Sequence, residues 1–401
     1  MNTNLKTFLL GLLTALLFSA FIYFASFHLT NKLINTLFGL AALALFLYIP
    51  KRSVLVAGFF IGLFWFYWIG YSFKYQGVGY MQPIITFAFA IIYLLFFLPL
   101  YFTDRPLIRA VFLFALSFFE PFDWNWLQIE LLFVESYFGV FKYQLAAILL
   151  ALALPSLLPK KGKYLPLLLL LVAINYGYPL QKEAPLKIKL VQTEIKQEDK
   201  WQSYALMPTV EMIFSKIDEA VAKKMDVIIF PESVFPFFMN KNQRIMKYLL
   251  EYSNKISIVV GSLLVQNHQH YNVTYLFENG HYSVAKKLVL VPFGEYIPLP
   301  KFARKFINDT FFSGASDFIT AKKPTDFTIK GIKFRNAICY EATCQEIYEG
   351  DVDFVIATSN NAWFAPSIEP TLQNLLLKYY ARKNGVTIYH AANYRGTGVI
   401  R

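Results

Sequence analysis

One short stretch sets the α/β character of the second half of this sequence: residues 227–233, Val-Ile-Ile-Phe-Pro-Glu-Ser. Four consecutive apolar residues that end at a proline are typical of a short strand buried on both faces. Glu232 follows directly after Pro231. In open α/β sheets, the side chains that do chemistry gather at the carboxyl ends of the strands. Glu232 is therefore the first candidate for a functional residue.

The alternation of strands and helices extends from residue 187 onward. We expect strands at 187–192, 257–261, 353–357 and 386–389, and helices at 210–221, 241–254 and 369–384. Asn279-Gly280 and Lys330-Gly331 are turn sequences between strand-like runs, which predicts two hairpins. Strands that interleave with helices and hairpins predict mixed sheets covered by helices.

The first half of the chain has a different composition. Residues 1–185 carry only 18 of the 64 charged side chains, and the whole chain is 56% hydrophobic and 18% aromatic. A helix needs about 20 mostly apolar residues to cross a bilayer. Seven segments are candidates: 7–28, 33–49, 54–73, 83–102, 106–122, 143–158 and 163–179. The first is long and lacks a small-residue cleavage site, so we expect a retained anchor rather than a signal peptide.

Basic residues between these segments predict the orientation of the chain. With a cytoplasmic N-terminus the outer loops hold only Lys32, Lys74 and Lys142. The inner loops hold Lys6, Lys51, Arg52, Arg105, Arg109, Lys160, Lys161 and Lys163. The positive-inside rule favours this orientation, and an odd number of spans then places residues from about 181 onward outside the cytoplasm. Loop topology and an anionic lipid surface account for much of the net charge of +12, so no nucleic-acid partner is needed.

The segment 123–142, between two apolar segments, begins with Asp-Trp-Asn-Trp-Leu-Gln and is rich in aromatic residues. This composition is typical of an interfacial aromatic belt. A lipid-contacting arm is the alternative interpretation.

Further residues could complete a reactive site with Glu232. Cys339 ends a strand-like run in Ala-Ile-Cys-Tyr-Glu (337–341). Lys286 and Lys287 precede the apolar run 288–291, which we expect to be an extended strand. A cysteine attacks a carbonyl as its thiolate, so it needs a base or a cation nearby. Adjacent side chains of a strand point to opposite faces, so only one of the two lysines can face Cys339. Glu232 could take the thiol proton and return it to the leaving group, and the lysine could stabilise the oxyanion.

Each of these residues also has an ordinary structural explanation. A glutamate after a strand is commonly solvated, a lysine before a strand commonly lies on the surface, and a lone cysteine commonly packs as a small hydrophobe. We expect Cys344 to be buried and inert rather than paired with Cys339 in a disulfide. His268 and His270 resemble a metal pair but have no further ligand at a suitable spacing, so a polar loop is favoured. No histidine offers a convincing Cys–His dyad.

Longer motifs around these residues resemble the apolipoprotein N-acyltransferases of the bacterial inner membrane, whose carbon–nitrogen hydrolase domain carries a Glu–Lys–Cys triad. The glutamate matches Glu232 in Phe-Pro-Glu-Ser, and the cysteine matches Cys339 in Ile-Cys-Tyr-Glu. The lysine matches Lys287, five residues before the first proline of Leu-Val-Pro-Phe-Gly-Glu-Tyr-Ile-Pro. Further matches are Trp201, Glu295, Tyr340, Glu341, Trp363 within Ser-Asn-Asn-Ala-Trp-Phe (359–364), and Trp-Leu-Gln at 126–128.

The resemblance implies a multi-span α-helical membrane module, at 1–180, and an extracytoplasmic, periplasmic α/β domain at 186–401 with an αββα nitrilase-like sandwich. It implies that Cys339 takes the sn-1 acyl chain of a phospholipid, phosphatidylethanolamine, as a thioester. The chain then passes to the N-terminal amine of a diacylglyceryl lipoprotein. Glu232 acts as base and then acid, and Lys287 stabilises the oxyanion. We expect no metal or organic cofactor, and a monomer because nothing argues for an interface.

The supporting residues also receive roles from the resemblance. Glu295 supports the triad, Glu341 lies near the nucleophile, and Tyr340 is a further residue on which the family relies. Trp201 and Trp363 either line the mouth of the lipid-binding site or pack in the core.

Two features depart from the family pattern. Asn361 stands where many relatives have an aspartate. The sequence ends at Arg401, before the further strands and final membrane helix of most members, so we expect a domain shortened at its C-terminus.

Two other functions stay open at the level of sequence. A membrane-anchored nitrilase-type amidase would use the same residues with water as the acceptor, although a hydrolase of small amides needs no seven spans. An inactive lipid-binding relative would keep the fold without the chemistry.

Overall fold

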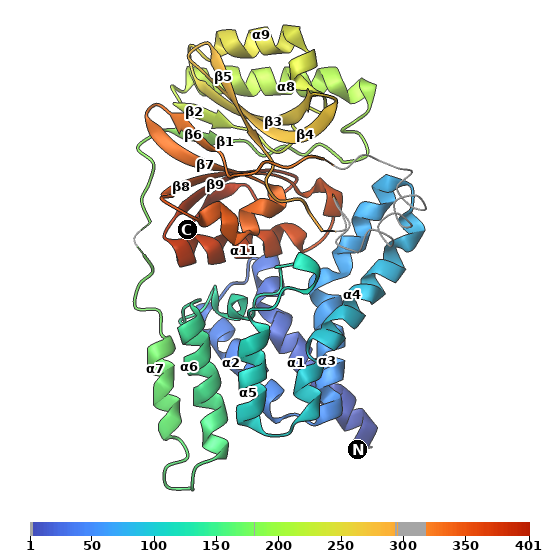
Figure 1. Cartoon of the computed structure of the whole chain (residues 1–401), viewed down its shortest axis with the longest axis vertical. Coiled ribbons are helices and arrows are strands. Elements are labelled where there is room, and N and C mark those ends of the chain that lie inside the picture. The colour runs from blue at the N-terminus through green and yellow to red at the C-terminus, as the bar shows by residue number, and fades with distance from the viewer. Residues whose placement is uncertain (1–2, 180, 293–294, 296–317) are drawn as a thin grey trace. The chain divides into compact units, whose positions relative to one another are not determined.

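The structure, a computed structural model, describes residues 3–179, 181–292, 295 and 318–401. The chain divides into two compact units, Met1–Tyr178 and Pro179–Arg401. The first unit is helical (Figure 1). Its α-helices are α1 (Thr3–Ser26), α2 (Lys32–Tyr48), α3 (Lys51–Phe66), α4 (Gln82–Phe96), α5 (Pro106–Leu116), α6 (Lys142–Ala153) and α7 (Leu170–Ala173).

These helices differ in how far they can reach through a bilayer. Among the described residues, three helical stretches are long and apolar enough to cross a membrane: Thr3–Ser26, Lys51–Tyr75 and Gly79–Phe96. Shorter apolar helices cover Lys32–Tyr48, Pro106–Leu116 and Lys142–Ser156. Each of the seven expected segments overlaps one of the helices α1 to α7, and the number that cross the bilayer stays a prediction.

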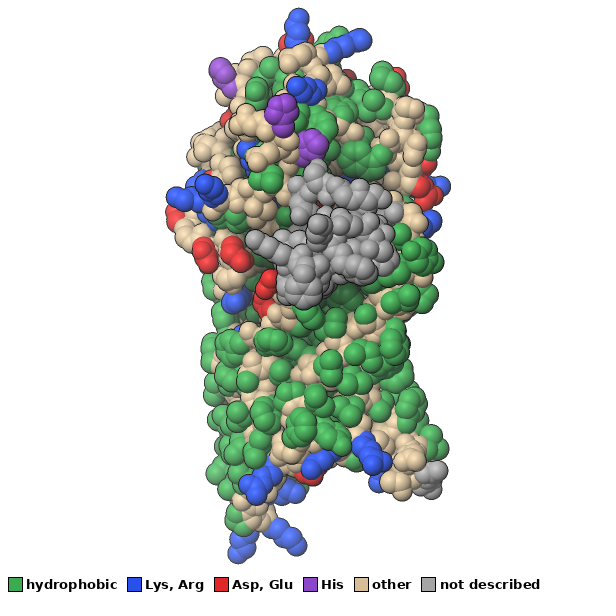
Figure 2. All heavy atoms as spheres, turned by 45° about the vertical axis from the view of Figure 1, so that its right-hand side comes forward, with side chains coloured by type: hydrophobic (Ala, Val, Ile, Leu, Met, Phe, Trp, Pro, Cys, Tyr) green, Lys and Arg blue, Asp and Glu red, His purple; other side chains and the backbone are tan. Residues whose placement is uncertain are grey.

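The outer surface of the first unit is apolar, as a lipid-facing surface requires. On α1 the side chains of Leu5, Leu9, Leu13 and Leu16 recur every three or four residues and are all more than 40% exposed. Phe18 and other residues of the same helix are fully buried. Figure 2 shows hydrophobic side chains covering the helices of this unit, with Lys and Arg gathered at one end. Helices that are apolar on both their buried and exposed faces are typical of membrane proteins.

Small residues allow these helices to approach closely. A Cβ added to Gly62 of α3 would lie 2.6 Å from the carbonyl oxygen of Phe89 and 2.9 Å from Cα of Ala90, both on α4. Only glycine permits this approach, and close packing of this kind is a main source of helix association in lipid.

Arg109 donates hydrogen bonds to backbone carbonyl groups of neighbouring segments in the first unit. Its guanidinium is 1% exposed and donates to carbonyl oxygens at the end of α2, with the Ile49 oxygen at 2.6 Å and the Phe46 oxygen at 3.2 Å. Its Nε donates to the oxygens of Leu100 and Thr103 at 3.1 and 2.8 Å. The last carbonyl groups of a helix have no N–H partner within that helix, so they need a donor from elsewhere. Arg109, assigned to an inner loop by sequence, therefore lies on helix α5 as a buried cap for other segments.

We expect Arg109→Ala to destabilise the first unit by about 2–3 kcal/mol, because several buried carbonyl groups would lose their donors. The measurement is the thermal unfolding midpoint of the full chain in detergent. Arg105→Ala is the matched control, because Arg105 is an exposed arginine directly before α5. Equal midpoints for the two variants would contradict the capping role.

The described residues of the second unit form two five-stranded sheets. The first sheet has the order β1-β2-β3-β4-β5 and the second β10-β9-β8-β7-β6. Their strands are β1 (Ile188–Leu190), β2 (Val227–Ile229), β3 (Ser257–Gln266), β4 (Gln269–Glu278), β5 (His281–Lys286), β6 (Asp326–Ile329), β7 (Ile332–Ile338), β8 (Phe354–Asn360), β9 (Thr387–Asn393) and β10 (Gly398–Ile400). Each sheet contains both parallel and antiparallel pairs.

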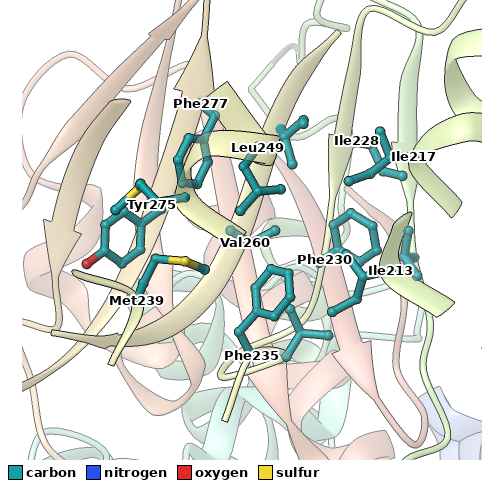
Figure 3. Packing of buried hydrophobic residues seen from close by; sticks show 14 of the residues in the cluster. Ile213, Ile217, Ile228, Phe230, Phe235, Met239, Leu249, Val260, Tyr275 and Phe277 are labelled. Carbon is teal, nitrogen blue, oxygen red and sulfur yellow. The ribbon is translucent and has the colours of Figure 1, made fainter. Parts of the chain in front are cut away.

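Strand β2 shows why the sheets stack. Ile228 packs with Phe230 in a core formed with α8 (Ser203–Ala222) and α9 (Gln243–Tyr252), as Figure 3 shows. Val227 and Ile229 point the other way, into a core that includes residues of the second sheet. The helix α11 (Glu369–Asn384) lies against the other face of the second sheet (Figure 1). The expected helix–sheet–sheet–helix sandwich is confirmed.

One local expectation is wrong. The apolar run 288–291 forms no strand, and β5 ends at Lys286. The backbone N–H groups of Leu288 and Val289 donate to the carboxylate of Glu341, at 2.5 and 3.1 Å, instead of to a neighbouring strand. Strand β3 is also longer than expected and reaches Gln266.

Candidate functional site

Cys339 lies at a sharp turn. Strand β7 ends at Ile338, and Cys339 begins the 3-10 helix η9 (Cys339–Thr343) with a φ of 56°. A positive φ is uncommon for a residue with a side chain, and such conformations cluster at functional sites. The Cys339 side chain is partly exposed, while Tyr340 and Glu341 beside it are buried. The turn therefore presents the thiol at the end of a strand.

Glu232 follows β2 in the other sheet and is held on both carboxylate oxygens. Asn272 of β4 donates its side-chain amide to Oε1 at 2.7 Å. The backbone N–H of Asn360, the last residue of β8, donates to Oε2 at 2.9 Å. Glu232 is only 7% exposed, so it is not the solvated strand-end residue that sequence alone left open. Its hydrogen bonds join the two sheets.

Gly261 of β3 allows the backbone of Glu232 to take this position. A Cβ at Gly261 would lie 2.3 Å from the nitrogen of Ser233 and 2.7 Å from Cα of Glu232. Both distances are shorter than real Cβ contacts. The backbone after β2 can therefore lie this close to position 261 only because that residue is glycine. Ser233 itself has a φ of 47°.

Lys287 is the lysine that faces Glu232. Its side chain is 1% exposed, and Nζ lies 2.7 Å from Oε2 of Glu295 and 3.7 Å from Oε1 of Glu232. Burial favours the neutral amine, but Glu295 and Glu232 outweigh it and raise the pKa of Lys287 above its ordinary value. Lys287 therefore keeps its charge. Within 293–298, only Glu295 belongs to the described residues.

Lys286 points away from this cluster. Its Nζ donates to Oε1 of Gln266 at 2.8 Å and lies 3.8 Å from the centre of the Tyr271 ring. The two neighbouring lysines thus lie on opposite sides of the chain.

The thiol of Cys339 is electrostatically coupled to the same groups. Burial raises its pKa well above the ordinary value, Glu232 raises it further, and Lys287 lowers it. The resting side chain is therefore a thiol rather than a thiolate, so it needs a base at the moment of attack.

Glu341 fastens the turn of Cys339 to the segment after Lys287. Its Oε1 accepts from the backbone N–H of Ile338 at 2.6 Å, and its Oε2 accepts from Leu288 and Val289. Burial raises the pKa of Glu341 to about 7, although these N–H groups and Lys287 act in the opposite direction. Glu341 thus fixes the distance between two chain segments of the cluster.

The other residues singled out from sequence differ in burial and in their contacts. Tyr340 is 2% exposed, and its carbonyl oxygen accepts from the Thr343 hydroxyl at 2.7 Å. Trp201, just before α8, is 47% exposed. Trp363 is half-buried in η11 (Asn361–Phe364), and its Nε1 lies 3.2 Å from the side-chain amide of Asn360. Cys344 is buried, and its thiol is directed at the Tyr340 oxygen at 3.6 Å.

Sequence reasoning missed several members of the site. Lys200, Asn272 and Asn360 contact Glu232, and each is at most 5% exposed. Glu369, the first residue of α11, is 1% exposed, and burial followed by the charge of Glu232 raises its pKa well above the ordinary value. A polar residue inside an apolar strand, such as Asn272 in β4, was the available signal.

A serine and a histidine form a second buried arrangement. Nε2 of His390 lies 2.9 Å from Oγ of Ser359, and Nδ1 lies 3.2 Å from Oδ1 of Asn374 and 2.9 Å from the Gly396 oxygen. Ser359 and His390 are both 0% exposed, and burial lowers the pKa of His390 to about 4. No substrate can reach this hydroxyl, so the arrangement is structural.

Comparison with known proteins identifies the family. Residues 5–176 match the family model of the apolipoprotein N-acyltransferase integral membrane domain, and residues 187–398 match that of carbon-nitrogen hydrolases. The apolipoprotein N-acyltransferase of Wolinella succinogenes is 42% identical to this chain, with 98% of this chain and 96% of that protein covered. The chain belongs to the apolipoprotein N-acyltransferase family.

Two further apolipoprotein N-acyltransferases support the same assignment. The protein of Helicobacter hepaticus is 37% identical over 92% of this chain and 94% of its own length. That of Helicobacter pylori is 38% identical over 92% and 87%. The chain is thus a bacterial membrane protein with an acyltransferase membrane domain and a carbon–nitrogen hydrolase domain. Neither an amidase nor an inactive lipid-binding protein is favoured.

We expect Gly261→Ala to slow acyl transfer on the order of 100-fold, because a displacement of Glu232 by about 1 Å is enough for such a loss. The rate of acyl-thioester formation measures it. Gly398→Ala is the matched control, because a Cβ at Gly398 meets no atom within 4 Å. Wild-type rates in Gly261→Ala would show that the close approach to Glu232 does not matter.

Lys287→Ala should reduce activity on the order of 100–1,000-fold, as expected for the loss of a group that stabilises an oxyanion. Lys286→Ala removes the same side chain one residue earlier and should stay near the wild-type rate. The measurement is the initial rate of acyl transfer by each of the two variants. If Lys286→Ala were the slower enzyme, the assignment of the two lysines would be reversed.

Proposed function

We propose that the chain transfers an acyl chain from a phospholipid to the N-terminal amine of diacylglyceryl-modified lipoproteins, through a thioester on Cys339. One observation supports this most directly: Glu341 joins the turn of Cys339 to the segment after Lys287, and the Lys287 ammonium lies 3.7 Å from the carboxylate of Glu232. Membership in the apolipoprotein N-acyltransferase family supports the substrate class.

In the first half-reaction Glu232 acts as general base. It takes the proton of the Cys339 thiol as sulfur attacks the ester carbonyl of the donor, the sn-1 ester of phosphatidylethanolamine. The C–S bond forms, the C–O bond of the ester breaks, and Glu232 returns the proton to the leaving lysophospholipid oxygen. The raised pKa of the thiol supports this order, because little thiolate exists before substrate arrives.

In the second half-reaction the lipoprotein amine attacks the thioester. The amide C–N bond forms, the C–S bond breaks, and the amine proton passes through Glu232 to the sulfur. Lys287 stabilises the negative oxygen in both steps. Glu295 keeps Lys287 charged, since it forms the shorter of the two ion pairs. Lys287 is therefore an electrostatic stabiliser and not a base.

The remaining residues serve this reaction from around the cluster. Glu341 and Tyr340 support the turn of the nucleophile, and Trp201 and Trp363 line the mouth through which acyl chains reach it. We place residues 186–401 on the periplasmic side of the bacterial inner membrane, after seven spans of residues 1–180 with a cytoplasmic N-terminus. The working unit is a monomer that needs no cofactor.

The decisive experiment supplies phospholipid without acceptor to the purified full chain in detergent. Mass spectrometry should find one acyl group on Cys339 and none on Cys344, because Cys344 is buried beneath the turn. Cys339→Ala should abolish labelling and lipoprotein N-acylation, while Cys344→Ala keeps both within about 3-fold, as for a substitution in the core. Acyl groups on Cys344 alone, or full activity of Cys339→Ala, would refute the proposal.

A further inference from the structure

We infer that Lys200 is a positioning residue for the catalytic base, a second cation that holds Glu232 through its main chain and through Asn360. The inference rests on the proposed function, in which Glu232 moves the thiol proton. Lys200 is not one of the residues matched to the Glu–Lys–Cys triad.

The contacts of Lys200 converge on Glu232. Its Nζ donates to the main-chain oxygen of Glu232 at 3.1 Å and lies 3.1 Å from the side-chain amide of Asn360. Asn360 in turn donates its backbone N–H to Oε2 of Glu232. One ammonium group thus fixes both the backbone of the base and the residue that orients its carboxylate.

The burial of this ammonium is unusual for a structural lysine. Lys200 is 2% exposed, and in the described part of the chain it forms no ion pair with a carboxylate, unlike Lys287. Burying a cation without a paired anion costs folding free energy. A neutral side chain would fill the same space without that cost, which points to a use for the positive charge.

The charge matters because the site is rich in acidic groups. Glu232 faces Lys200 from the end of β2, and Cys339 faces it from the start of η9. Glu295 and Glu369 are also coupled to the cysteine, and Lys287 shares its charge between two carboxylates. Lys200 adds a second positive charge beside the carboxylate that accepts the thiol proton.

A dependence on pH follows. Burial lowers the pKa of Lys200 to about 8, although Glu232 and Cys339 act to raise it. The ammonium is therefore charged below pH 8 and is lost as the pH rises through that value, and the rate should fall there. Ionisation of Cys339 would instead raise the rate as the pH rises, because more of the thiolate nucleophile would form.

The test measures the initial rate of lysophospholipid release by the full chain in mixed micelles of detergent and phosphatidylethanolamine, without acceptor, from pH 6 to 10. Lys200→Met should be about 100-fold slower, as for a displaced catalytic group. The arginine of the Lys200→Arg variant keeps its charge at every pH of the test. This variant should therefore be more active than Lys200→Met, and the fall of its rate at alkaline pH should move above pH 9. Lys196→Met is the control, because Lys196 is exposed in the same segment.

Each outcome separates the two proposals. If the wild type releases no lysophospholipid at any pH, the proposed function fails. If the wild type is active but Lys200→Met matches it, or if Lys200→Arg declines at the same pH as the wild type, only the role of Lys200 is overturned. Should Lys200→Met fail to fold, the pH profile of Lys200→Arg decides alone, because a purely structural lysine would not move that profile.

Discussion

The carboxylate of Glu232 joins the two sheets of the second unit by hydrogen bonds beside their shared apolar core. Asn272 reaches it from the first sheet and the backbone of Asn360 reaches it from the second. A buried carboxylate is stable only when its oxygens accept hydrogen bonds or face a cation. Both conditions hold here, because Lys287 lies 3.7 Å away. The geometry of the site therefore depends on the packing of the whole sandwich, and not on any one loop.

The glutamates of this site differ in their hydrogen-bond and ion-pair partners. Glu295 holds Lys287 closely, which keeps the lysine positive. Glu341 is occupied with backbone N–H groups, which ties the segment after Lys287 to the turn of Cys339. Glu232, which accepts from Asn272 and from the backbone of Asn360, is the carboxylate that exchanges a proton in the proposed reaction. Three glutamates within one small region thus differ in role because their hydrogen-bond partners differ.

Much of this arrangement could be predicted from the sequence, and the exceptions have a physical cause. The turns at Asn279 and Lys330, and the strand before Glu232, follow from local preferences and were confirmed. The run 288–291 looks like a strand but gives its N–H groups to Glu341, a side chain distant in sequence. Lys200 and Asn360 were missed for the same reason, since only tertiary contacts bring them to Glu232. Local patterns contain no information on such partners.

The hydrogen bond from Asn360 to Glu232 joins residues that are 128 positions apart. Synthesis proceeds from the N-terminus, so Glu232, Lys287 and Cys339 all exist before Asn360 has been made. Until β8 is complete, the carboxylate lacks one of its hydrogen-bond donors, and the second sheet still lacks β9 and β10. A chain in mid-synthesis that already carries its thiol therefore still lacks the hydrogen bond that holds the second oxygen of the Glu232 carboxylate.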